Sequence, residues 1–252
     1  MPPGKTPRGL KSVSLSNYNN WRGHWGDYLG PDQAGIKSMF ARHMVVRRHE
    51  TVSNLTKGLW FDADNRNIIV EDCLIAHNLT DGIWSEINPD GVTIRDCVIA
   101  HNQSTGVVIA NSEHLIIENN KIFDNNWQQL GMWEPDEYRD NPVDGTDLVT
   151  HNLVLKNNWI MGETSSEKLL NWAGWSGLYS TMDSQNNKWY RPGARNGFYV
   201  DESNKTWTQW RTLVPQDTTS VYLDSAPDLS PPMPDPLGWQ TEPTASMIAL
   251  LK

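Results

Sequence analysis

The sequence has few cysteines, few phenylalanines and no long apolar run. Two of its 252 residues are cysteine and four are phenylalanine. No apolar stretch approaches the ~20 residues that a membrane-spanning helix needs, and the first residues, Met1–Gly4, do not provide the apolar core of a signal peptide. We therefore expect no membrane partner, and a chain given either in its mature form or without its natural start.

Basic residues are also scarce relative to acidic ones. The chain has 21 lysines and arginines against 30 aspartates and glutamates, a net charge of −9. This balance would repel the phosphates of a nucleic acid, so no nucleic-acid partner is expected. A polyanionic substrate would need a cation between itself and the protein.

Tryptophan is abundant by contrast, with 13 residues. An indole offers a broad apolar face with a hydrogen-bond donor at its edge, which suits the faces of sugar rings. Core or loop anchoring is an equally open explanation for these tryptophans.

The stretch from Lys57 to Asn126 repeats one pattern three times. Gly58, Gly82 and Gly106 are 24 residues apart. Between the glycines a second phrase recurs, which reads VEDCLIAHN over 70–78, IRDCVIAHN over 94–102 and IENNKIFDN over 117–125. A fixed period of this length indicates a solenoid, and its short apolar runs between Asn, Asp and Gly predict strands and turns.

This pattern, Gly-Ile-x-x followed by Ile-x-x-Asn-x-Ile-x-x-Asn, resembles the right-handed parallel β-helix repeat of pectate-lyase-like proteins over residues 35–162. The resemblance implies an all-β fold, a right-handed single-stranded parallel β-helix of the carbohydrate-active type with a C-terminal capping segment. That fold hosts lyases, hydrolases, epimerases and non-catalytic binding proteins, so it does not choose the function.

We expect one domain and a monomer. Residues 1–162 form the coils and include an N-terminal aromatic loop (18–34), which either carries function or covers the end of the solenoid. Residues 163–252 form a terminal coil and a capping and tail segment, with strands and one short helix near 206–213.

Three sets of positions are assigned to the fold itself. Cys73 and Cys97 stand one repeat apart and are expected to stack inside the core as free thiols, although their spacing is also compatible with a disulfide. The outward column Arg47, Glu71, Arg95 and Glu118 alternates in sign and is expected to stabilise the stack. Turn roles rather than metal ligation are expected for the histidines at coil edges, His43, His49, His77, His101, His114 and His151.

Strand alternation singles out another set. If Leu59, Phe61 and Ile83 point inward, the neighbouring positions point outward. These are Trp60, Asp62 and Asp64 in one coil and Trp84, Glu86 and Asn88 in the next, with Lys37 before them and Trp133 after them. Asp62 and Glu86 would then lie side by side, an arrangement that costs free energy unless it serves a function.

Three explanations of the acidic pair remain open. Asp62 and Glu86 are the carboxyls of a glycosidase; or Asp62, Asp64 and Glu86 bind Ca²⁺ in a lyase, with Lys37 as the base; or the acids are simply solvated. No cofactor is expected otherwise. Candidate sugar-binding residues are Trp60, Trp84, Trp133, Trp25, His24 and Asn88.

These observations predict a secreted or periplasmic protein that binds a plant or microbial polysaccharide and cleaves its glycosidic bonds, as a hydrolase or a calcium-assisted lyase. The alternative is a non-catalytic carbohydrate-binding module that uses the tryptophan face.

Overall fold

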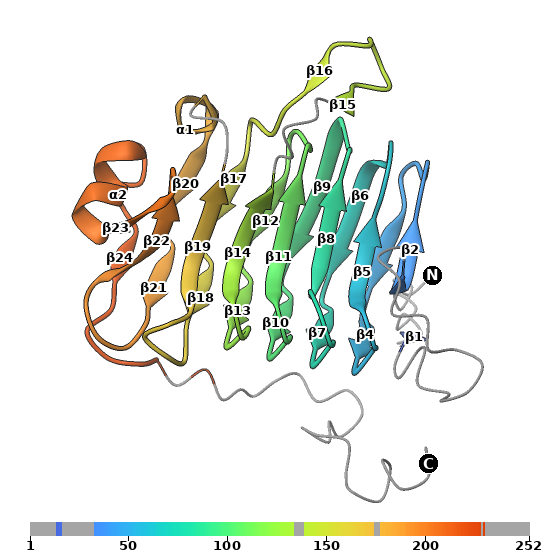
Figure 1. The fold of residues 1–252 in the computed structure, drawn as a ribbon. Helices are drawn as coiled ribbons and strands as arrows, with labels where there is room; N and C mark the ends of the chain where they lie inside the picture. Colours follow the sequence, from blue (N-terminus) through green and yellow to red (C-terminus); the bar gives the residue numbers. More distant parts are fainter. Residues whose placement is uncertain (1–13, 17–32, 134–138, 174–176, 228, 230–252) are drawn as a thin grey trace, which may run out of the picture.

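The computed structural model describes residues 14–16, 33–133, 139–173, 177–227 and 229. Short strands follow one another around the axis of a solenoid and build three long sheets (Figure 1). A complete coil contributes one strand to each sheet, so the chain is a parallel β-helix, as the repeat predicts. In the part of the chain described, no helix is long and apolar enough to cross a membrane.

The sheets differ in length and in how they end. In the first two, the order of strands is also their order along the axis, and all pairings are parallel except the last one of the second sheet. The first sheet contains β1 (Ser14–Leu15), β4 (His49–Val52), β7 (Leu74–Ala76), β10 (Val98–Ala100), β13 (Lys121–Phe123), β18 (Trp159–Met161), β21 (Lys188–Tyr190) and β24 (Val221–Tyr222). The second contains β2 (Ala34–Ser38), β5 (Lys57–Phe61), β8 (Ile83–Glu86), β11 (Thr105–Ala110), β14 (Gln128–Trp133), β19 (Lys168–Ala173), β22 (Asn196–Val200) and β23 (Ser203–Thr206). The third contains β3 (Val45–Arg47), β6 (Arg66–Glu71), β9 (Asp90–Arg95), β12 (Ile116–Glu118), β17 (Val154–Lys156) and β20 (Asp183–Gln185).

The glycines that set the 24-residue period are required by close packing between coils. A Cβ atom on Gly58 would lie 2.7 Å from the carbonyl oxygen of Gly82, and one on Gly82 would lie 2.6 Å from that of Gly106. Real Cβ atoms do not approach a backbone oxygen so closely. At Gly58 and Gly82 a side chain would therefore collide with the backbone of the next coil.

Buried asparagines link the coils at a corner. Asn54, Asn78, Asn102 and Asn125 are fully buried, and the backbone N–H of each of the first three donates to the Oδ1 of the next at 3.1 Å. This ladder satisfies polar groups that would otherwise be costly to bury. The Asn-x-Ser/Thr phrases at Asn54, Asn78 and Asn102 thus belong to the turns of the fold.

The two cysteines are buried free thiols, as expected. They stand at one end of a second asparagine ladder, because the backbone N–H of Cys97 donates to Asn120 Oδ1 at 2.9 Å and Asn120 in turn donates to Asn158 at 3.0 Å. Equivalent positions in successive coils are therefore occupied by either cysteine or asparagine.

The outward charges of the third sheet pair as predicted. Glu71 stands between Arg47 and Arg95 in register and forms an ion pair with each. Hydrogen bonds from Arg95, followed by those from Arg47, hold the pKa of Glu71 below its usual value although burial opposes them. Glu118 follows Arg95 in the same column.

The coils continue past residue 162, beyond the stretch in which the sequence repeat is easy to see. Strands β19, β20 and β21 complete one more coil, and Asn187 extends the second asparagine ladder by accepting from Asn158 at 3.0 Å. The expected short helix is α2 (Trp207–Leu213), which begins with a capping box between Thr206 and Gln209. Two short elements lie outside the sheets, the hairpin β15 (Arg139–Asp140) and β16 (Asp147–Leu148), and helix α1 (Leu178–Thr181).

Candidate functional site

The outer face of the second sheet carries the predicted column. Lys37, Trp60 and Trp84 stand opposite one another on β2, β5 and β8, and the column continues with Val108 and Gly131. The inward neighbours Leu59, Phe61 and Ile83 are buried, as the alternation predicts.

The side chain of Trp60 is buried, which corrects the expectation that Trp60 and Trp84 present two exposed indoles side by side. Only 6% of Trp60 is exposed. The Nζ of Lys37 lies 3.6 Å from the centre of its ring, and that of Lys57 lies 4.2 Å from it and 4.9 Å from the ring of Trp84. Cation–π contacts with both lysines therefore occupy Trp60.

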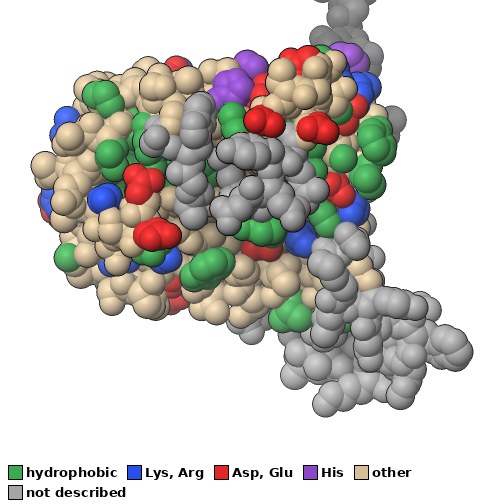
Figure 2. All heavy atoms as spheres, turned by 45° about the horizontal axis from the view of Figure 1, so that its top comes forward, with side chains coloured by type: hydrophobic (Ala, Val, Ile, Leu, Met, Phe, Trp, Pro, Cys, Tyr) green, Lys and Arg blue, Asp and Glu red, His purple; other side chains and the backbone are tan. Residues whose placement is uncertain are grey.

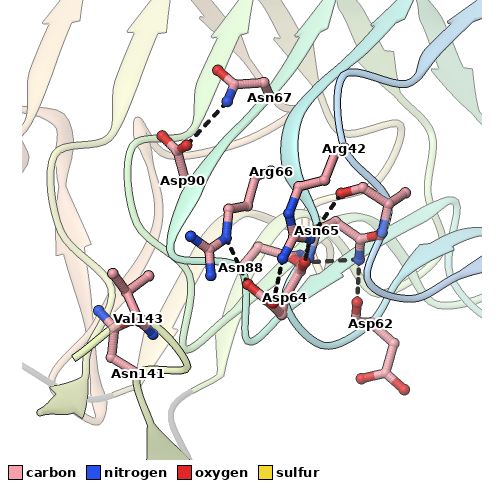
Figure 3. Close-up of polar contacts among 11 residues, drawn as sticks. Arg42, Asp62, Asp64, Asn65, Arg66, Asn67, Asn88, Asp90, Asn141 and Val143 are labelled. Atoms are coloured by element: carbon pink, nitrogen blue, oxygen red, sulfur yellow. Dashed lines mark hydrogen bonds and ion pairs between the residues drawn. The ribbon is translucent and has the colours of Figure 1, made fainter. Parts of the chain in front are cut away.

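The carboxylates do not gather as the calcium hypothesis requires. Asp62 pairs with Lys37 at 2.9 Å, whereas Asp64 is held by Arg42 at 2.5 Å and Arg66 at 2.7 Å. Figure 3 shows Asp64 between the two arginines while the carboxylate of Asp62 points away from them. Burial alone would raise the pKa of Asp64, but the hydrogen bonds and charges of Arg66 and Arg42 keep it below its usual value.

This geometry corrects the metal set. A carboxylate that two guanidinium groups already neutralise cannot be counted with Asp62 and Glu86 as a ligand of a shared cation. Lys37 forms an ion pair with Asp62 and lies over the ring of Trp60, whereas the lyase hypothesis needs a lysine that faces the substrate unpaired.

Asn88 faces inward, contrary to expectation. It is fully buried, its Nδ2 donates to the Phe61 carbonyl at 2.8 Å, and its Oδ1 accepts from the backbone N–H of Asn65 at 2.9 Å. Asn65 and Asn88 belong to a third ladder of hydrogen bonds inside the solenoid. Asn88 therefore cannot touch a ligand on the outer face of the second sheet. His24 and Trp25 lie outside the described residues.

A groove of about 350 Å³ opens on the second sheet beside Trp84. Val108 and Gly131 form its floor. They put a valine side chain and then none into the column that Trp60 and Trp84 fill in the preceding coils. Trp133 and Trp127 flank it and are 50% and 52% exposed. Trp133, two residues beyond Gly131 on β14, leans against Trp84 with ring centres 5.9 Å apart and nearly perpendicular.

A row of polar groups runs along the groove. Asp81 accepts from the backbone N–H of Thr105 at 3.0 Å, Gln128 donates to the Thr105 hydroxyl at 3.0 Å, and Asn171 donates to Gln128 at 2.6 Å. Burial raises the pKa of Asp81, although hydrogen bonds and the charge of Lys57 oppose the rise. The groove thus combines apolar walls with amide, hydroxyl and carboxyl groups.

The sequence reading missed this polar row. Two of its members, Asp81 and Thr105, precede a repeat glycine and, with Lys57, are spaced 24 residues apart like those glycines. Gln128 and Lys168 continue the column. Following the residue before each glycine along the repeat would have found Asp81 and Thr105, whereas Gln128 and Asn171 lie in coils without the repeat glycine.

Sequence comparison gives the class of protein. A sequence model of the family described as right handed beta helix region matches residues 12–126 and 86–206. The chain belongs to this family, which confirms the predicted fold class and its handedness. None of the curated proteins compared with the chain matches it in sequence.

Solved structures with a similar fold include three epimerases. The A-module of Azotobacter vinelandii mannuronan C-5 epimerase AlgE6 gives a TM-score of 0.57 at 16% identity, covering 85% of this chain and 55% of that one. The AlgE4 A-module from the same organism gives 0.49 at 19% identity, with 63% and 42% covered. The periplasmic alginate epimerase AlgG gives 0.45 at 21% identity, with 55% and 32% covered. This chain therefore spans about half or less of the length of these structures.

Proposed function

We propose that this protein binds a polysaccharide in the groove between Trp84 and Asn171 on the second sheet. The observation that carries the proposal is the pairing of exposed indoles, Trp127 and Trp133, with a continuous polar row along one hollow. Sugar rings need both features, because their C–H faces pack on aromatic rings while their hydroxyls require hydrogen-bond partners.

The fold supports the proposal in a weaker way. The AlgE6 A-module, whose fold this chain shares over 85% of its length, is named as an epimerase of mannuronan, a polysaccharide. A shared fold raises the expectation of a polysaccharide ligand without assigning the reaction. A secreted or periplasmic location agrees with such a ligand.

Cleavage of the glycosidic bond is the second candidate, with Asp62 and Glu86 as the two carboxyls. Phe61 stands opposite Ser85, so Asp62, the residue after β5, follows the same register as Glu86, the last residue of β8. Strands in a sheet are about 4.8 Å apart, a spacing that suits the closely placed carboxyls of a retaining glycosidase. In this scheme Lys37 positions the carboxylate of Asp62 through their ion pair at 2.9 Å.

Affinity electrophoresis tests binding. The full chain is run through gels that contain neutral glycans (xylan, mannan, β-glucan) or uronans (polygalacturonate, alginate), and retardation by at least one polymer is expected. Trp133→Ala and Trp127→Ala should each weaken the retardation at least several-fold. Trp159→Ala, on the first sheet, is the matched control and should leave it unchanged.

Retardation by no polymer, or equal retardation of the wild type and both groove variants, would refute the proposed site. Reducing ends and unsaturated products are measured in parallel on the same polymers. New reducing ends that disappear in Glu86→Gln support the hydrolase, whereas binding without any product leaves a carbohydrate-binding module.

A further inference from the structure

A second polar cluster lies on another part of the molecule, at the turns that lead from the second sheet to the third. Glu113 and His114 occupy the turn between β11 and β12, and His151 lies just before β17 in the next coil. A ligand atom from each of the three side chains lies within 4.8 Å of those from the other two. Figure 2 shows histidine side chains beside acidic ones along this edge of the solenoid.

The backbone fixes the positions of all three residues. Glu113 and His151 form a parallel β-bridge between consecutive coils, and the N–H of His114 donates to the His151 carbonyl at 3.1 Å. The N–H of Glu113 donates to the Asn88 carbonyl of the preceding coil at 2.9 Å. Their Cα atoms are thus tied to the hydrogen-bonded stack, and only the side chains need to adjust.

The side chains face one another across the two coils. Oε1 of Glu113 lies 3.6 Å from Nδ1 of His151, and Oε2 lies 3.9 Å from Nε2 of His114. Nδ1 of His151 also lies 3.0 Å from the Val149 carbonyl. These two contacts hold the ring of His151 in place beside Glu113.

We propose that Glu113, His114 and His151 bind one Zn²⁺ ion, with water completing the coordination. This replaces the turn roles alone that the sequence indicated for the two histidines. Two imidazoles and one carboxylate suit Zn²⁺, whereas Ca²⁺ and Mg²⁺ prefer oxygen ligands alone. Bonds of about 2.0–2.2 Å place tetrahedral ligand atoms roughly 3.4 Å apart, so the side chains must close by about 1 Å. His114 is 54% exposed on its side chain and free to make this movement.

The ion would join the turn that carries Glu113 to the chain that re-enters the solenoid after the β15–β16 hairpin. Bound Zn²⁺ therefore stabilises the folded state by mass action, as does any ligand that prefers the native protein. The site is separate from the groove on the second sheet, and binding there is independent of any sugar.

Equilibrium dialysis of the full chain against micromolar Zn²⁺ tests the proposal. We expect one equivalent bound, not displaced by a large excess of Ca²⁺, and a thermal unfolding midpoint that rises by several degrees with Zn²⁺. His114→Gln and His151→Gln should each weaken binding at least tenfold and abolish the rise in the midpoint. Glu113→Gln should also weaken binding while keeping the shape of the side chain.

His101→Gln is the matched control, because His101 stacks on His77 in another turn, with ring centres 5.0 Å apart. Each variant is checked for folding by its circular dichroism and its unfolding midpoint without metal. Folded His114→Gln and His151→Gln proteins that bind Zn²⁺ like the wild type overturn the proposal, and so does the absence of saturable binding in the wild type. Loss of the bound equivalent in His101→Gln instead would overturn it too.

Discussion

Asp124 is a carboxyl group that destabilises the protein at neutral pH, and replacing it should stabilise the fold. It follows β13 in a hollow of about 320 Å³ that Glu163 and Glu167 also line. Its Oδ1 atom is buried and has no hydrogen-bond partner among the described residues. Burial, followed by the charges of Glu163 and Glu167, raises the pKa of Asp124 from 3.8 to about 7.

The direction of the pH effect follows from this shift. Between the ordinary pKa and the raised one, folded Asp124 holds its proton while the unfolded chain has lost it, so stability falls as pH rises from about 4 to about 7. A shift of about 3 pKa units corresponds to about 4 kcal/mol. Because Asp124 is only half-buried, solvent screening reduces the penalty to about 1–2 kcal/mol.

Asp124→Asn removes the charge and retains a residue that tolerates the φ of 52° at this position. We expect the variant to be about 1–2 kcal/mol more stable than the wild type at pH 8 and nearly equal to it at pH 4. Urea unfolding at several pH values between these limits measures the difference. A gain that does not depend on pH, or a loss of stability at pH 8, would refute the reasoning.

Asp72→Asn is the control for this experiment. Asp72 is exposed and occupies a turn with a φ of 53°, so the substitution makes the same chemical change in the same backbone conformation without relieving a buried charge. We expect it to give no comparable gain at pH 8.

Three further substitutions test the account of the fold by urea unfolding. Gly82→Ala should cost about 2 kcal/mol, because its Cβ would lie 2.6 Å from a backbone oxygen of the next coil, and an unchanged midpoint would mean that the coils can spread. Ile87→Asn should raise the free energy of unfolding by about 1 kcal/mol, because a φ of 53° strains isoleucine more than asparagine. A lower free energy of unfolding would show that contacts of the isoleucine side chain outweigh the strain. Glu71→Gln should lower the free energy of unfolding at pH 7, because it removes the ion pairs with Arg47 and Arg95. The difference from the wild type should disappear as pH falls through the lowered folded pKa of Glu71. An equally large difference at pH 3 would contradict the role of these ion pairs.

The fold and the ladders could be predicted from the sequence because each coil repeats one set of constraints. The glycine at or just before the start of the strands β2, β5, β8 and β11, the buried asparagine and the alternating charges all recur at a nearly constant spacing. The coils after residue 162 were harder to see, since insertions separate their phrases. Their asparagines still mark them, as Asn187 shows by joining the ladder of Asn120 and Asn158.

The candidate site was predictable only where strand alternation holds. Within β5 and β8 it placed Trp60 and Trp84 on the outer face correctly. Past the ends of these strands Asp64 and Ile87 adopt φ values of 56° and 53°, and such left-handed residues turn the chain and break the alternation. Asn88 therefore points inward. The burial of Trp60 was missed for another reason, because Lys57 belongs to a different column and reaches over it.

The way the groove is made bears on the shape of its ligand. In a stack of identical coils the columns stay in register, so a hollow arises only where small residues replace large ones in consecutive coils, as Val108 and Gly131 do after Trp84. Such a hollow runs along the solenoid axis. From Trp84 to Asn171 it crosses three steps between strands, about 14 Å at ~4.8 Å each. A ligand that fills it must therefore be extended, which is why polymers rather than single sugars are the appropriate probes of the proposed function.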